Sequence, residues 1–193
     1  IGNRGQMIEG NFKAQLTLLR NIGTAEAPAF EVVDSDFANI SALNLSNLKP
    51  TLIDFDGDDI IDLVFSATQN NQTQVYLIAG VANGDEIEFD QSRIESVGFT
   101  TGLNDNVAFH DINEDGKMDL LLAKNSGSLN YYLNTGEASN PIFTLETENY
   151  LGIDDNNVAS NLNVVIADFT EDGKADLLTS DLSGRLTLYA DFK

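Results

Sequence analysis

The chain has 193 residues, of which 42% are hydrophobic, and this length and composition fit one domain, or part of one, with a sizeable buried core. A formal net charge of −21 with only 10 scattered basic residues excludes nucleic acid and anionic membrane surfaces as main partners, because both are bound through clustered Lys and Arg. The absence of cysteine excludes disulfides, thiolate catalysis and cysteine zinc sites, and no apolar run approaches the roughly 18 residues of a membrane span.

The first 48 residues have the features of a partial repeat. Ala14–Arg20 is a leucine-rich run that predicts a strand, and it ends at the polar phrase Asn21–Phe30. A similar phrase returns at Asn134–Phe143, and a middle copy at 78–89 lacks the proline. Repetition at a fixed period of several tens of residues is typical of propellers and solenoids.

Three acidic loops of nine residues each occur in the rest of the chain, at intervals of 57 residues. They are Asp54–Asp62, Asp111–Asp119 and Asp168–Asp176. Each places carboxylate, amide or hydroxyl oxygens at its first, third, fifth and ninth positions. Ca²⁺ takes about six to eight oxygen ligands at flexible geometry, so a short loop with this spacing, together with the carbonyl of its seventh residue, can supply most of the coordination shell. The sequence therefore predicts up to three bound calcium ions.

Each loop lies between two predicted strands, and two more strands follow. Strands entering the loops are predicted at Thr51–Ile53, Val107–Phe109 and Val164–Ile166. Strands leaving the loops are predicted at Ile60–Phe65, Met118–Leu122 and Ala175–Leu178. Third strands are predicted at Gln74–Ile78, Ser128–Leu133 and Arg185–Tyr189, and fourth strands at Ile87–Phe89 and Ile142–Leu145. No segment shows a sustained helical pattern.

We therefore predict an all-β fold of β-propeller blades with four antiparallel strands each, repeated about three and a third times. The predicted units are a partial blade at 1–48, blades at 49–105 and 106–162, and a partial blade at 163–193. Closed propellers usually have about four to eight blades, so the chain is expected to be part of a larger propeller. It begins at Ile1 rather than Met, which favours a mature or excised piece of a larger parent chain.

The end of each loop distinguishes between calcium-binding families. An EF-hand or dockerin-type loop needs a bidentate acid at its twelfth position, which here is Phe65, Leu122 or Thr179. With a ninth-position acid followed at once by an apolar strand, the motif resembles the calcium loops of FG-GAP/VCBS-type repeats. These are β-propeller blades of bacterial secreted and surface proteins and, more distantly, of the integrin α-subunit head. The resemblance implies calcium sites formed by Asp54, Asp56, Asp58, Ile60 and Asp62, by Asp111, Asn113, Asp115, Lys117 and Asp119, and by Asp168, Thr170, Asp172, Ala175 and Asp176.

Two loops depart from the pattern of that family. Asp59 stands at the sixth place, where glycine is usual, so the first loop must turn at a residue with a Cβ. Thr170 replaces the third-position carboxylate with a neutral hydroxyl, and the third site is expected to be the weakest, because ligand charge tunes calcium affinity. Two other interpretations stay open. The loops could be Asp-Gly turns whose carboxylates cap their own amides, or metal sites with a purely structural role.

Other residues offer no comparable site. His110, the only histidine, precedes the second loop, where packing or a hydrogen bond is expected. Tyr131 and Tyr132 are expected to pack between blades rather than to form a sugar-binding face. Spacing does not exclude paired carboxylates for glycoside hydrolysis, but the well-placed acid clusters all belong to the calcium loops. With no Gly-rich phosphate loop, serine elbow or His-rich zinc motif, no catalytic or cofactor-binding residue is predicted.

The function expected from these features is that of a non-catalytic, calcium-stabilised module of a secreted or cell-surface protein, which binds a protein or a glycan or mediates adhesion. Millimolar extracellular calcium would keep sites of modest affinity filled. Two alternatives stay open: the blades could be an accessory part of a secreted polysaccharide-degrading enzyme, or a scaffold piece of a surface export or assembly machine. Fold alone does not identify the partner, because binding loops vary freely on one scaffold.

Overall fold

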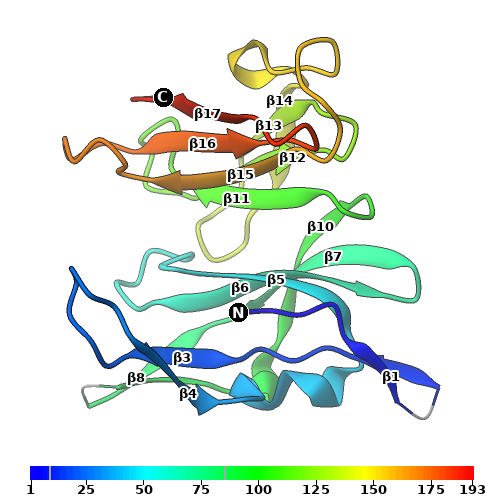
Figure 1. The fold of residues 1–193 in the computed structure, drawn as a ribbon, viewed down its shortest axis with the longest axis vertical. Helices are drawn as coiled ribbons and strands as arrows, with labels where there is room; N and C mark the ends of the chain where they lie inside the picture. Colours follow the sequence, from blue (N-terminus) through cyan, green and yellow to red (C-terminus); the bar gives the residue numbers. More distant parts are fainter. Residues whose placement is uncertain (9, 85) are drawn as a thin grey trace. The chain divides into compact units, whose positions relative to one another are not determined.

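The computed structural model describes residues 1–8, 10–84 and 86–193, and this part of the chain consists of β-strands, turns and three short 3₁₀ segments (Figure 1). The 3₁₀ segments are η1 (Phe37–Leu43), η2 (Gln91–Arg93) and η3 (Tyr150–Gly152). The strand pairs with a described register are antiparallel. The predicted all-β fold is therefore confirmed. None of the described helical segments is long and apolar enough to cross a membrane.

The chain divides into two compact units. The first contains Ile1–Asp54 and Asp59–Val97, and the second contains Phe55–Asp58 and Gly98–Lys193. The predicted blade boundaries are not tested by this division and remain a prediction.

A four-stranded sheet has the strand order β10-β7-β6-β5, and its first three strands in chain order belong to the first unit. Its strands are β5 (Ser46–Ile53), β6 (Asp62–Gln69), β7 (Gln72–Ile78) and β10 (Glu95–Thr101). The first three correspond to predicted strands, although β6 begins at Asp62, so Ile60 and Ile61 belong to the loop. A strand is present at the predicted Ile87–Phe89, but it is not the fourth strand of this sheet. Those residues form β9 (Glu86–Phe89), which pairs with β8 (Gly80–Asn83) as a separate hairpin, with Gly80 opposite Phe89.

The N-terminal segment forms two short hairpins. They are β1 (Gln6–Ile8) with β2 (Asn11–Lys13), and β3 (Leu18–Asn21) with β4 (Phe30–Asp34). The predicted strand at Ala14–Arg20 is only partly correct, because its first half pairs with irregular segments instead of a strand. The Ala14 N–H donates to the Leu45 carbonyl, and the Leu16 carbonyl accepts from the Phe37 N–H.

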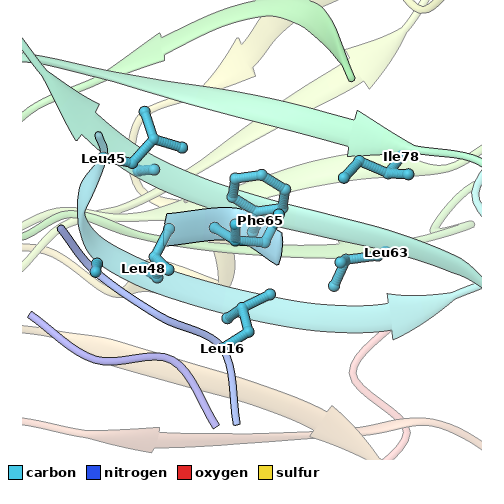
Figure 2. Packing of buried hydrophobic residues seen from close by; sticks show 9 residues of the cluster. Leu16, Leu45, Leu48, Leu63, Phe65 and Ile78 are labelled. Atoms are coloured by element: carbon cyan, nitrogen blue, oxygen red, sulfur yellow. The ribbon is translucent and has the colours of Figure 1, made fainter. Parts of the chain in front are cut away.

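The core of the first unit forms around the middle strand β6. Leu63, Val64 and Phe65 are all at most 2% exposed, so both faces of this strand are covered and it has no polar alternation. Figure 2 shows the surrounding apolar side chains, which come from β5, β7 and the N-terminal segments. Those labelled besides Leu63 and Phe65 are Leu16, Leu45, Leu48 and Ile78.

The second unit contains two further antiparallel sheets. One has the order β11-β12-β13-β14, and its strands are β11 (Asn106–His110), β12 (Asp119–Ala123), β13 (Leu129–Asn134) and β14 (Phe143–Thr147). The other has the order β15-β16-β17, and its strands are β15 (Asn163–Ala167), β16 (Asp176–Ser180) and β17 (Leu186–Tyr189). The predicted strands in this region are confirmed to within one or two residues. Buried side chains including Leu121, Leu129, Ile153, Leu162 and Leu177 form the core.

The repeated polar phrase is a hairpin loop held by one asparagine. The Asn134 Oδ1 accepts hydrogen bonds from the N–H groups of Gly136 (3.0 Å) and Ile142 (3.1 Å). The equivalent Asn21 Oδ1 accepts from Gly23 (2.9 Å) and Ala29 (3.0 Å). The same residue types therefore give the same loop between β13 and β14 as between β3 and β4.

This loop leaves no room for a side chain at its glycine. A Cβ on Gly136 would lie 2.5 Å from the Asn140 carbonyl oxygen and 2.7 Å from the Ile142 nitrogen. We expect Gly136→Ala to lower the melting temperature by about 4–8 °C, because main-chain atoms of the loop must move. Ser139→Ala, an exposed substitution in the same loop, serves as the control in the same thermal scans. Equal melting temperatures for the two variants would contradict this close approach.

Candidate metal centre

The ninth acid of every loop is buried at the start of the strand that leaves the loop. Asp62, Asp119 and Asp176 are at most 1% exposed and are the first residues of β6, β12 and β16. One carboxylate oxygen of each accepts a main-chain N–H from the last residue of the third strand of its repeat or from a residue just beyond that strand. The pairs are Gly80 N to Asp62 Oδ1 (2.9 Å), Asn134 N to Asp119 Oδ1 (2.8 Å) and Asp191 N to Asp176 Oδ1 (3.0 Å). This carboxylate therefore ties the loop to the third strand.

The second oxygen of the ninth acid holds the beginning of the loop. The Asp119 Oδ2 accepts from the Ile112 N–H (3.2 Å) and the Tyr131 hydroxyl (3.0 Å). Burial and this hydrogen bond to Asp119 raise the pKa of Tyr131. A carboxylate offers about four acceptor sites, and three of those on Asp119 are taken. As a calcium ligand it would have one lone pair to offer, on Oδ1.

Asp176 repeats this arrangement in the third loop. Its Oδ2 accepts from the N–H groups of Phe169 (2.8 Å) and Thr170 (2.9 Å). The main-chain hydrogen bond from Asp191, followed by those from Phe169 and Thr170, holds the pKa of Asp176 below its ordinary value, because all of them favour the charged carboxylate. The buried ninth acids thus accept hydrogen bonds from the protein itself.

The first acid of each loop caps the loop's own main chain. Asp111 accepts from the N–H groups of Asp115 (3.0 Å) and Gly116 (2.8 Å). The other caps run from Asp172 and Gly173 to Asp168 (3.2 and 2.9 Å) and from Asp59 to Asp54 (3.1 Å). This is the capping that the Asp-Gly turn interpretation predicts. It does not exclude a metal, because a carboxylate oxygen that accepts one hydrogen bond keeps a second lone pair.

The fourth and sixth residues of all three loops have left-handed main-chain geometry. In the first loop these are Gly57 (φ 81°) and Asp59 (φ 67°), so the acid does turn at the sixth place as the sequence requires. In the second loop they are Glu114 (φ 61°) and Gly116 (φ 82°), and Glu171 and Gly173 repeat this in the third. Glycine and acid have exchanged places in the first loop while the conformation is kept.

The first loop brings three carboxylates together. Asp54, Asp56 and Asp58, at alternate places of one continuous segment, each offer an oxygen within 4.8 Å of the others. Within the described residues, no other group of three or more Asp, Glu or His is this compact. The spacing and the hard oxygen donors fit a calcium ion. The second and third loops have Asn113 and Thr170 at the third place, and each therefore has one carboxylate fewer there.

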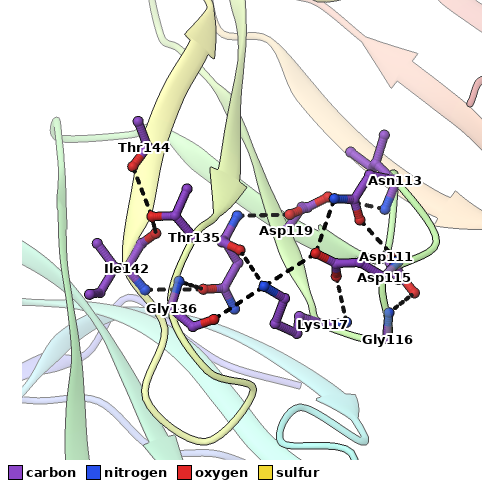
Figure 3. A network of polar contacts seen from close by, with 12 residues as sticks. Asp111, Asn113, Asp115, Gly116, Lys117, Asp119, Thr135, Gly136, Ile142 and Thr144 are labelled. Carbon is purple, nitrogen blue, oxygen red and sulfur yellow. Dashed lines mark hydrogen bonds and ion pairs between the residues drawn. The ribbon is translucent and has the colours of Figure 1, made fainter.

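The seventh residue of the second and third loops is a lysine whose ammonium contacts the loop. The Lys117 Nζ lies 3.2 Å from Asp115 Oδ2 and donates to the carbonyls of Asn134 (3.0 Å) and Gly136 (3.2 Å) (Figure 3). Partial burial acts to raise the pKa of Asp115. The hydrogen bonds from Asn113 and Lys117 and the charge of Lys117 outweigh this effect, so the pKa of Asp115 lies below its ordinary value. The sequence predicts only the Lys117 carbonyl as a metal ligand and gives no indication of these side-chain contacts.

The third loop has a similar contact from Lys174. This residue, not the predicted Ala175, is the seventh counting from Asp168. Its Nζ lies 2.6 Å from Asp191 Oδ2 and 3.9 Å from Asp172 Oδ2. The hydrogen bond and the charge of Asp191 raise the pKa of Lys174. Asp191 stands where the second repeat has Asn134, since both donate their N–H to the ninth acid.

The aromatic candidates pack, as expected. The half-buried His110 lies beside Phe192, with 5.7 Å between ring centroids, and burial together with the Lys193 charge lowers the pKa of His110. Tyr131 lies 5.2 Å from Tyr150 and binds Asp119. Tyr132 packs edge-on against Phe99 at 4.9 Å.

A family model described as FG-GAP-like repeat matches this chain twice, over residues 54–122 and 111–179. Each match begins at the first acid of one loop and ends just after the next loop, and the two matches are offset by the 57-residue interval seen in the sequence. No curated protein and no solved structure gives a significant match. Repeats of this kind are typical of extracellular or surface proteins and are generally non-catalytic. Because the matches together span more than half of its residues, the chain belongs to the FG-GAP-like repeat family.

Proposed function

We propose that this chain is a calcium-stabilised, non-catalytic binding module, part of a larger β-propeller in a secreted or cell-surface protein. The observation that carries the proposal is the compact group of Asp54, Asp56 and Asp58. Three carboxylates held this close repel one another in the absence of a counter-ion, and a divalent cation among them removes the repulsion. Calcium suits the group because it accepts hard oxygen ligands at variable geometry, and millimolar extracellular calcium would fill even a weak site.

The three loops are not equivalent as calcium sites in this proposal. The first has acids at its first, third and fifth positions, the second has an amide at the third, and the third has a hydroxyl there. Since ligand charge tunes affinity, the first loop binds most tightly, and the second and third loops, with one carboxylate fewer each, bind more weakly. Bound calcium then has a structural role, fixing the turn that joins two neighbouring strands of a blade.

The partner in this proposal is a protein or a glycan that contacts loops at the ends of the strands. Support comes from the architecture, in which antiparallel sheets present their connecting loops at the strand ends, where binding residues are commonly found. The net charge of −21 favours a neutral or basic partner surface and disfavours nucleic acid.

Isothermal titration of the EGTA-treated, desalted protein with CaCl₂ tests this proposal. We expect saturable binding with one tightest site and weaker heats from any further sites. Titration with MgCl₂ is the control, because Mg²⁺ demands near-ideal octahedral geometry and gives up water reluctantly. A flat calcium titration at millimolar concentrations would contradict the proposal. If calcium binds, glycan and protein arrays probed with and without EGTA would then identify the class of partner.

A further inference from the structure

The Lys117 ammonium is surrounded by oxygen atoms in a way that resembles a bound cation. Its three N–H groups have three acceptors: the Asp115 carboxylate and the carbonyls of Asn134 and Gly136 (Figure 3). The side chain is only 25% exposed. These contacts join the fifth position of the acidic loop to the hairpin that follows β13, which is the same hairpin that the buried Asp119 holds through the Asn134 N–H.

The other two loops have different contacts at the seventh position. Lys174 makes a related contact in the third loop, but its side chain is 62% exposed and it binds a carboxylate, Asp191, instead of carbonyls. The first loop has Ile60 at the seventh position. A Cβ at Gly80 would lie 3.1 Å from the Ile60 Cγ2, so this side chain also lies against the end of the third strand. An isoleucine there supplies packing but no charge.

We infer that Lys117 is a built-in cation, which holds the second loop against its hairpin without a metal and makes this loop independent of calcium. Lys174 does the same for the third loop, more weakly because it is more exposed. The first loop, with an apolar residue at that place, relies on a metal ion. This contrast with the first loop rests on the proposed calcium function, whereas the role of Lys117 in the metal-free protein does not.

Electrostatics explains why a loop held by a lysine needs no metal ion. Hydrogen bonds between an ammonium and a carboxylate are charge-assisted and are strengthened where water is partly excluded. A calcium ion at the second loop would have to share Asp115 with the ammonium, and the two positive charges would repel each other. Lys117 therefore stabilises the empty loop and lowers its affinity for calcium at the same time.

Thermal unfolding of Lys117→Met in EGTA tests the inference. Methionine keeps the apolar stem of the side chain and removes the charge, so we expect the melting temperature to fall by about 4 °C or more. Saturating calcium should reduce this deficit, because Asp115 becomes available to the ion. Lys124→Met is the matched control, since the Lys124 ammonium has no ion pair within the described residues. A fall no larger than that of Lys124→Met would overturn the inference. If calcium stabilises the unmodified chain, a deficit that calcium leaves unchanged would overturn it as well.

The reverse substitution keeps the native lysines and gives an independent answer. Ile60→Lys places an ammonium at the seventh position of the first loop, so the calcium-induced rise in melting temperature should shrink relative to the unmodified chain. A calcium-induced rise in melting temperature as large as that of the unmodified chain would contradict the inferred role of the lysine as a built-in cation. If the unmodified chain shows no calcium response, the proposed function fails, while the comparison of Lys117→Met with Lys124→Met in EGTA still decides the role of Lys117.

Discussion

Asp119→Ala is expected to lower the free energy of unfolding by about 4 kcal/mol, or about 8–16 °C in melting temperature. The substitution leaves three buried or part-buried donors without their acceptor: the N–H groups of Ile112 and Asn134 and the Tyr131 hydroxyl. An unsatisfied buried donor costs roughly 1–3 kcal/mol, which is why one carboxylate can have so large an effect. The loss is expected in EGTA as well as in calcium, because these contacts need no metal.

Three comparisons separate this effect from a general loss of charge. Tyr131→Phe removes one donor and should cost only about 1 kcal/mol. Asp119→Asn keeps one carbonyl oxygen as acceptor and should fall between Tyr131→Phe and Asp119→Ala. Glu148→Ala removes an exposed acid from the same unit and should have almost no effect. Chemical unfolding in urea measures all four variants, and an Asp119→Ala protein as stable as Glu148→Ala would refute the proposed role of the carboxylate.

The double substitution Asp56→Asn with Asp58→Asn is expected to abolish most of the calcium-induced stabilisation. In the unmodified chain, calcium at about 100 times its dissociation constant should add roughly 2.7 kcal/mol, or about 5–10 °C. The amides keep the size of the side chains but remove two of the three charges that attract the ion. In EGTA the double variant should be at least as stable as the unmodified chain, because the carboxylates no longer repel one another.

Asp172→Asn provides the matched control, because it changes the fifth position of the third loop. Its calcium response should stay close to that of the unmodified chain, since the third loop is expected to contribute less than the first. Thermal scans across a series of calcium concentrations would measure both proteins. A full calcium response in the double variant, or a response lost only in Asp172→Asn, would contradict the assignment of the first loop as the main site.

Local patterns predicted the strands next to the loops, and long-range pairing determined the rest. The strands β11, β12 and β13 were predictable because turn residues and apolar runs define them locally. The run Ile87–Phe89 has the same local appearance, but Gly80–Phe89 closes on itself as a hairpin and β10 takes the edge of the larger sheet. Composition carries no information about which strand pairs with which.

A repeated bend after the fourth strand of a repeat was also missed. Ala38 and Leu151 have the same left-handed geometry (φ 55°, ψ 20°), and the fully buried Ile40 and Ile153 follow two residues later. Non-glycine residues seldom adopt this conformation, so residue propensities do not predict it at Ala38 or Leu151. The available signal was the spacing of an aromatic residue three places before the isoleucine, at Phe37 and Tyr150.

For the candidate site, residue types were predictable but their partners were not. Spacing alone selected the ninth acids, yet their hydrogen bonds reach residues 15 or 18 places further on, such as Asn134 and Gly80. The contacts of the Lys117 ammonium were likewise missed, because two of its three acceptors lie on the β13–β14 hairpin. The linear motif therefore gives the candidate metal ligands, and the folded hairpin gives the lysine contacts on which the proposed difference between the loops rests.

The unequal role of the three loops can be tested most directly by crystallising the chain in millimolar calcium and measuring anomalous diffraction. We expect a strong anomalous peak among Asp54, Asp56 and Asp58, with a weaker peak or none in the other loops, and the Lys117 ammonium still bound to Asp115. Strong peaks in the second and third loops with Lys117 displaced, or no peak in the first loop, would contradict this expectation.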